Sequence, residues 1–123
     1  MLAALFGSLT HLTLTYCSID AGAAALALAP ALAQTAGLVE LHLIFNPFGP
    51  PGGQWLPAIL TVLTHLRKVD LCSCGLDVQG CIATVRSLKD RDGMVVRLSD
   101  NGITRGSAED NALHNTPGIC VIL

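Results

Sequence analysis

The stretch LRKVDLCSCGLDVQGC, residues 66–81, decides the expected fold of this 123-residue chain. Val69 and Leu71 stand two residues apart, so on an extended backbone both side chains point to one face of a short strand. Cys74 and Leu76 follow at the point where the chain must leave that strand and turn inward. The stretch therefore predicts a short strand with one buried face, then a turn, and then a helix.

The same pattern occurs four times along the chain. Within each segment, positions 4, 6 and 11 are apolar and position 9 is Asn or Cys. Position 1 is apolar in the first three segments and glycine in the fourth. The segments begin near residues 9, 38, 66 and 93 and read LTHLTLTYCSI, LVELHLIFNPF, LRKVDLCSCGL and GMVVRLSDNGI. The starts are separated by 29, 28 and 27 residues, which is too regular for chance and indicates an internal repeat.

Position 9 is expected to hold the turns together. An Asn there can bond the backbone of adjacent turns, and a small buried Cys can fill the same space. The position is occupied by Cys17, Asn46, Cys74 and Asn101.

Each strand is expected to lead through a glycine-rich turn into a helix. The expected turns lie at Gly22, residues 50–53, Gly80 and Gly106. The expected helical stripes are Leu26, Ala29, Leu32 and Ala33; Leu56, Ile59, Leu60 and Leu63; and Ile82, Val85 and Leu88. Pro30 predicts a kink or an early stop in the first helix.

Residues 66–85, LRKVDLCSCGLDVQGCIATV, resemble the L-x-x-L-x-L-x-x-[CN]-x-L-x-x-x-G-C pattern of ribonuclease-inhibitor-like leucine-rich repeat proteins. The first two repeats match well and the fourth matches in part, so the resemblance runs from Leu9 to Leu113. The resemblance implies an α/β leucine-rich repeat solenoid with a curved parallel sheet on its concave side and helices on its convex side. Stacking is also expected physically, because one strand-helix unit cannot bury its own apolar face.

We expect one leucine-rich repeat domain over residues 1–123, with about four repeats of 27 to 29 residues. Residues 1–8 are expected to end a preceding helix, and residues 114–123 to form a C-terminal tail or an edge strand. Neither end carries an evident polar cap. We therefore expect either that the chain is a piece of a longer one or that a partner covers an end.

Composition excludes several classes of protein. Only 13% of residues are charged, and seven Lys and Arg face nine Asp and Glu, which argues against nucleic-acid binding and a polybasic membrane binder. The apolar run 21–33 is too short to span a bilayer, so we expect no membrane insertion. Five cysteines without paired spacing predict free thiols in an intracellular, reducing compartment, with the cytoplasm first. For Cys72 and Cys74 a local metal or redox pair is the alternative.

Catalytic arrangements are sparse. The four histidines, His11, His42, His65 and His114, stand apart from any nucleophile or carboxylate at a signature spacing, and no phosphate loop is present. We therefore expect no catalytic residue, no cofactor and no metal site, and assign the histidines to surface or capping roles.

The candidate site is the concave face, as a surface for protein partners. Its expected residues are His11, Thr13, Thr15, Tyr16, Glu40, His42, Ile44, Phe45, Lys68, Asp70, Arg97 and Ser99. The column Thr13, His42, Asp70 and Arg97 is either a binding strip or a ladder of cross-strand pairs. For Phe45, the alternative is that its ring tucks under the following proline-rich loop.

A second candidate is the proline-rich loop after Asn46, as a docking element. Its expected residues are Pro47, Phe48, Pro50, Pro51 and Trp55. The alternative for Trp55 is that it packs the second helix onto the core.

The sequence thus predicts a non-catalytic protein-protein interaction module, a scaffold or an accessory subunit of a multi-subunit assembly. The alternative is a regulator of a small GTPase, resembling GTPase-activating proteins built from similar repeats, with Arg105 as the residue of interest. A substrate-recognition arm of a ubiquitin ligase would need an adaptor-binding helix pair that this sequence lacks.

Overall fold

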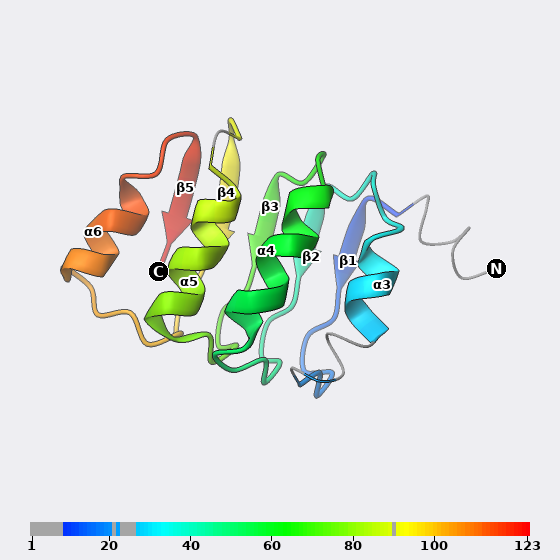
Figure 1. The fold of residues 1–123 in the computed structure, drawn as a ribbon, viewed down its shortest axis with the longest axis horizontal. Helices are drawn as coiled ribbons and strands as arrows, with labels where there is room; N and C mark the ends of the chain where they lie inside the picture. The colour runs from blue at the N-terminus through cyan, green and yellow to red at the C-terminus, as the bar shows by residue number, and fades with distance from the viewer. Residues whose placement is uncertain (1–8, 21, 23–26, 90) are drawn as a thin grey trace.

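The computed structural model describes residues 9–20, 22, 27–89 and 91–123. These residues form an α/β structure with one parallel sheet of five strands in the order β1-β2-β3-β4-β5 (Figure 1), which confirms the expected α/β class and its parallel sheet. The strands are β1 (His11–Thr13), β2 (Glu40–His42), β3 (Lys68–Asp70), β4 (Met94–Arg97) and β5 (Ile119–Ile122). The helices are α3 (Ala29–Leu32), α4 (Gly52–Val62), α5 (Asp77–Ser87) and α6 (Ala108–His114).

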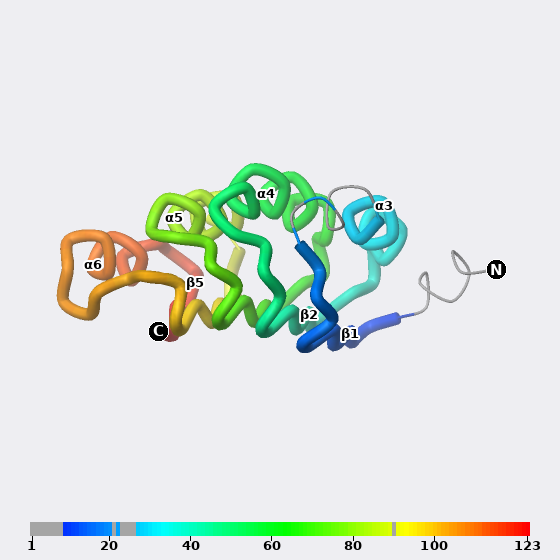
Figure 2. Tube along the Cα trace, turned by 90° about the horizontal axis from the view of Figure 1, so that it is seen from below, coloured from blue at the N-terminus to red at the C-terminus, as the bar shows by residue number. Residues whose placement is uncertain are grey.

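The helices lie together on one side of the sheet, and the other face of the sheet is left open (Figure 2). This layering follows from the parallel pairing, since the chain must cross back between neighbouring strands and does so through a helix each time. The expectations for residues 1–8 and for Leu26 fall outside the described residues. Within the described residues, no helix is both long and apolar enough to cross a bilayer.

The core lies between the sheet and the helices. Leu41, Val69 and Val96 are paired neighbours in adjacent strands and are fully buried. Leu56 and Leu60 from α4 are buried in the same cluster. Alternation along each strand therefore sends one set of side chains into the core and the next set to the open face.

Three of the four expected glycine turns carry helical glycines instead, and Gly22 is the first of them. Gly80 lies inside α5, and Gly52 and Gly53 are the first two residues of α4, so both helices begin earlier than the glycines suggested. The real turns use backbone in the left-handed region, as at Gly49 and Gly106, with φ of 67° and 80°. Pro30 lies in the first turn of α3, where proline is tolerated, and the described helix is short.

Arg91 closes the end of α4 from the following strand-helix unit. Its Nη1 donates to the carbonyl of Leu63 at 2.7 Å, and its Nη2 donates to the carbonyls of Leu60 at 2.7 Å and Thr61 at 3.2 Å. Leu60 and Thr61 belong to the last turn of α4 and Leu63 is its C-cap, where few backbone donors are available; the Leu60 and Leu63 carbonyls also accept from the N–H groups of Leu63 and Leu66 at 3.2 and 3.1 Å. Burial lowers the pKa of the Arg91 guanidinium, in keeping with its position between two units.

Candidate interaction face

The strand register arranges the open face of the sheet in rows that cross the strands. One row contains His11, Glu40, Lys68, Val95 and Cys120. The next contains Thr13, His42, Asp70, Arg97 and Ile122, which includes the four residues expected to form one column. Sequence reasoning missed Cys120 and Ile122, because the last strand had no repeat pattern from which to assign its outward positions.

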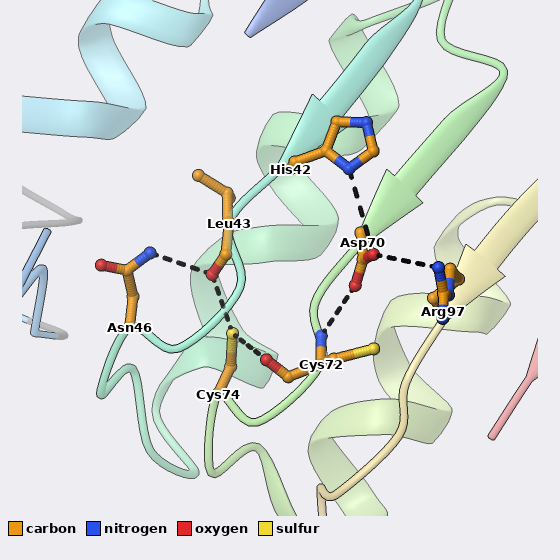
Figure 3. Close-up of polar contacts among 7 residues, drawn as sticks. All are labelled: His42, Leu43, Asn46, Asp70, Cys72, Cys74 and Arg97. Carbon is orange, nitrogen blue, oxygen red and sulfur yellow. Dashed lines mark hydrogen bonds and ion pairs between the residues drawn. The ribbon is translucent and has the colours of Figure 1, made fainter. Parts of the chain in front are cut away.

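Asp70 is the centre of the polar part of this face (Figure 3). Its Oδ2 lies 3.9 Å from His42 Nδ1 and 3.8 Å from Arg97 Nη1, and its Oδ1 accepts a hydrogen bond of 3.1 Å from the backbone N–H of Cys72. Only 3% of Asp70 is exposed, although it points to the open face, because its two neighbours cover it. The Arg97 side chain is 44% exposed and therefore presents its charge to solvent.

A second polar pair lies at the start of the strands. His11 Nε2 is 2.8 Å from Glu40 Oε2, with 61% and 30% of the two side chains exposed. A pair this open contributes about 0 to 1 kcal/mol to folding. Lys68, next in the same row, is half-buried. This part of the face is thus polar and weakly held, in contrast to the buried carboxylate of Asp70.

Tyr16 and Phe45 form an exposed aromatic stack just beyond the strands. Their ring centroids are 4.3 Å apart with an interplanar angle of 8°, and the residues are 69% and 45% exposed. Both have left-handed backbone, with φ of 57° and 59°. Phe45 therefore does not tuck under the proline-rich loop. Ser73 and Asp100 share this left-handed backbone at the equivalent position of their units, and Ser73 Oγ donates to Asp100 Oδ2 at 3.4 Å. Sequence reasoning missed this polar pair because no pattern in the sequence indicates it.

The expected role of position 9 is confirmed for the asparagines. Asn46 Oδ1 accepts from the N–H groups of Cys17 and Ile19 at 3.1 and 3.2 Å, and Asn46 Nδ2 donates to the carbonyls of Leu14 and Leu43 at 2.6 and 2.9 Å. Asn101, in the unit after that of Cys74, makes the same set of bonds. Its Oδ1 accepts from the N–H groups of Cys74 and Leu76, both at 3.1 Å, and its Nδ2 donates to the carbonyls of Leu71 and Leu98 at 2.8 and 3.1 Å. These side chains bind the turns of neighbouring units to one another.

Cysteine at position 9 behaves differently at its two occurrences. Cys74 is buried and its Sγ donates to the carbonyl of Leu43 at 3.1 Å, so that this carbonyl lies between Asn46 and Cys74 (Figure 3). Cys17 is exposed, and the prediction that it fills a buried space is wrong. The physical reason is its position in the unit of β1, which is an edge strand of the described sheet.

Only part of the proline-rich loop is exposed, and the expectation of a surface position is wrong for Phe48. Phe48 is 1% exposed, and its ring packs edge-on against Trp55, with centroids 5.1 Å apart. Trp55 belongs to α4 and packs against the core, which agrees with the alternative interpretation of this residue. Of the five predicted residues, Pro47, Pro50 and Pro51 are exposed, so what remains at the surface is a proline turn without its aromatic anchors.

Outside the open face, His114 and Arg105 make local contacts. Within the described residues, no three His, Cys, Asp or Glu side chains cluster as metal ligands. His114 Nδ1 lies 2.8 Å from Asp110 Oδ1 on the same helix, α6. Arg105, on which the GTPase hypothesis depends, is exposed and donates to the carbonyl of Leu123 at 3.0 Å.

The five free cysteines are expected to react in a fixed order. Burial raises the pKa of Cys74 to about 11 and that of Cys81 to about 12, whereas Cys17 and Cys120 are exposed. Since the thiolate is the nucleophile, iodoacetamide at pH 8 should modify Cys17 and Cys120 at least about a hundredfold faster than Cys74 and Cys81. Peptide mass spectrometry of timed samples measures the order, and denaturant should equalise all five. Equal rates in the native protein would contradict the burial of Cys74 and Cys81.

Comparison with known proteins gives no relative: no family model, no curated protein and no solved structure matches this chain.

Proposed function

We propose that this chain is a non-catalytic protein-protein interaction module, a scaffold or accessory subunit of a larger assembly, built as a ribonuclease-inhibitor-like leucine-rich repeat solenoid. The open, concave face of the sheet is its binding surface. The observation that carries the proposal is the Tyr16 and Phe45 stack, which exposes two aromatic rings at the edge of that face. Exposed aromatic side chains are typical anchors of protein interfaces.

The backbone beneath these rings supports the same proposal. A non-glycine residue with left-handed backbone is uncommon, and a bulky aromatic one is rarer still. Tyr16 and Phe45 both adopt this left-handed backbone. Two hydrogen bonds hold them in it: Tyr16 N–H donates to the Ile44 carbonyl and Phe45 N–H donates to the Cys72 carbonyl, both at 3.1 Å. The rings are thus fixed before a partner arrives, which reduces the entropy cost of binding.

Charge completes the proposed surface. Arg97 presents a half-exposed guanidinium with its Nη1 3.8 Å from Asp70 Oδ2, and arginine is enriched with aromatic residues at binding hot spots. The partner is therefore expected to place an apolar or planar group on the aromatic stack and an acceptor near Arg97.

Site-specific photo-crosslinking in cells of the organism that encodes the chain tests this function. A benzophenone amino acid replaces Phe45 in one variant and Val62 in another; Val62 is 50% exposed on α4, on the helix side. We expect a discrete crosslinked protein from position 45 and none from position 62. Adding Tyr16→Ala to the position-45 variant should lower the crosslinked yield about tenfold or more, the scale of losing one aromatic hot spot.

Two results would refute the proposed function. One is equal crosslinking from positions 45 and 62, which would indicate random encounters. The other is a folded chain that stays monomeric and without a partner at high concentration, together with no crosslink from position 45. Circular dichroism of each variant establishes that the fold is retained.

A further inference from the structure

The residues at position 8 of the repeat form a row just beyond the ends of the strands. All four have left-handed backbone, with φ of 57° to 61°: Tyr16, Phe45, Ser73 and Asp100. The N–H groups of the first three each donate to the carbonyl of the residue before the next member of the row, at 3.1, 3.1 and 2.9 Å. Each member therefore lies beside the next one, at about the strand spacing of 4.7 to 4.9 Å.

The row changes from aromatic to polar at its middle. The rings of Tyr16 and Phe45 stack with centroids 4.3 Å apart and an interplanar angle of 8°, so both ring planes stand across the row. Tyr16 covers one face of the Phe45 ring, and the other face is turned toward Ser73. The Ser73 side chain ends at Oγ and is too short to cover that face, and Phe45 is 45% exposed.

Asp100 places a negative charge on the far side of Ser73. It is exposed, and its Oδ2 accepts from Ser73 Oγ at 3.4 Å. Within the described residues no Lys, Arg or His forms an ion pair with Asp100; Arg97, three residues earlier, lies near Asp70 instead. We call the open face of the Phe45 ring, Ser73 Oγ and the Asp100 carboxylate the aromatic-acidic site.

We propose that the aromatic-acidic site binds an arginine side chain of the partner protein. This inference rests on the proposed function and names the group that the binding face takes. A guanidinium is flat, always charged and stacks on aromatic faces, so it fits against the open face of Phe45. The ring and the carboxylate are two row spacings apart, about 9 to 10 Å, which leaves room for one flat group between them.

Ser73 and Asp100 supply the polar contacts of this arrangement. A hydroxyl that donates one hydrogen bond keeps lone pairs that accept, so Ser73 Oγ can accept from a guanidinium N–H while it donates to Asp100. Ser73 lies between the two sides of the site, which places its oxygen close to the plane of the stacked guanidinium. The Asp100 carboxylate then faces the positive charge from the side opposite the ring.

Other side chains satisfy only part of the site. A lysine ammonium carries the same charge, but it is compact, strongly hydrated and without a flat face to lay on a ring. A phenylalanine would stack on Phe45 but would place an apolar ring against the Asp100 carboxylate, which costs desolvation without a partner. An aspartate or glutamate would meet a like charge.

A peptide titration of the complete 123-residue chain followed by nuclear magnetic resonance tests the proposal. The probe is the capped peptide acetyl-Gly-Arg-Gly-amide. We expect saturable shifts of the Phe45 and Ser73 amide signals, with a Kd of about 1 to 10 mM for a single side chain. The arginine δ-methylene protons should move upfield, because they lie over an aromatic ring. The amide of Val62, exposed on α4, should not shift.

Matched peptides identify the recognised group. Citrulline has the shape of arginine without the charge, so the citrulline peptide should bind about fivefold more weakly, the combined scale of a cation on a ring and an exposed ion pair. The lysine peptide should also bind more weakly than the arginine peptide. Equal affinities of the arginine and citrulline peptides would overturn the proposal, and so would tighter binding of a phenylalanine peptide.

Two protein variants locate the site. Ser73→Phe should abolish the shifts, because a third ring would cover the open face of Phe45, and two aromatic residues already adopt this backbone. Thr64→Phe, exposed in the α4 to β3 connection, is the control and should leave binding unchanged. Asp100→Asn keeps the shape and removes the charge, so it should lower the affinity for the arginine peptide about threefold or more.

Three further results would overturn the proposal. They are the absence of saturable shifts at about 50 mM arginine peptide, binding that Ser73→Phe leaves intact, and binding that Asp100→Asn leaves unchanged. If Ser73→Phe fails to fold, Asp100→Asn and the citrulline peptide still decide. None of these results changes the crosslinking expected from position 45, which requires a partner but no arginine, so the two proposals fail separately.

Discussion

Asn101→Leu is expected to lower the free energy of unfolding by about 3 to 5 kcal/mol, a large part of the total stability of a domain this size. The substitution leaves the N–H groups of Cys74 and Leu76 and the carbonyl of Leu71 buried without partners. Each such group costs about 1 to 3 kcal/mol, and the added apolar contact of leucine offsets only part of the sum. Urea unfolding followed by circular dichroism measures the loss.

Two further variants separate the amide chemistry from the volume change. Asn46→Leu should cost less than Asn101→Leu, because the Cys17 and Ile19 N–H groups that Asn46 binds are only partly buried and water can reach them. Asn101→Cys should be intermediate, since Cys74 occupies the equivalent position in its own unit. If Asn101→Leu fails to fold, the stability losses of Asn46→Leu and Asn101→Cys still test whether the asparagine bonds stabilise the fold. A loss below about 1 kcal/mol for Asn101→Leu would show that these bonds do not hold the units together.

Spacing predicted the repeated short strands and their buried faces well, while the parallel sheet was what the resemblance implied. Apolar residues two apart fix which face of each strand is buried, and the near-constant interval between Leu41, Val69 and Val96 brings them into one register. The asparagine bonds were predictable for the same reason. A side chain with a donor and an acceptor, placed at the same point of each unit, has the backbone of the neighbouring unit within reach.

The proline-rich loop shows where such reasoning fails. Phe48 stands at the apolar position 11 of its repeat, which is a core position. The prolines and glycines around it nevertheless suggested an exposed turn. In the structure the repeat position decides, and Phe48 is buried against Trp55. The buried state of Asp70 was also not predictable. It depends on His42 and Arg97 lying over it from both neighbouring strands, which is a matter of side-chain conformation rather than spacing.

Gly53→Ala is expected to destabilise the chain by about 2 to 3 kcal/mol, although alanine is the better helix former by about 1 kcal/mol. A Cβ atom on Gly53 would lie 2.6 Å from the Cα atom of Gly80, so α4 and α5 would have to separate. Backbone cannot rotate away as a side chain can, and the two helices share the core that includes Leu56 and Leu60. The pair of glycines is therefore a packing contact between helices, not the pair of turns that the sequence suggested.

Gly80→Ala is the matched control, because the contact is not symmetric. A Cβ atom on Gly80 points elsewhere and has its nearest neighbour, Leu76 Cβ, at 3.3 Å, with Gly53 N at 3.7 Å. We expect a change within about 1 kcal/mol of the original stability, since the helix propensity of alanine offsets the tighter contact. Thermal and urea unfolding of the two variants measure the difference. Equal losses would mean that the helices shift freely, and then the close approach at Gly53 would not be what sets the distance between neighbouring units.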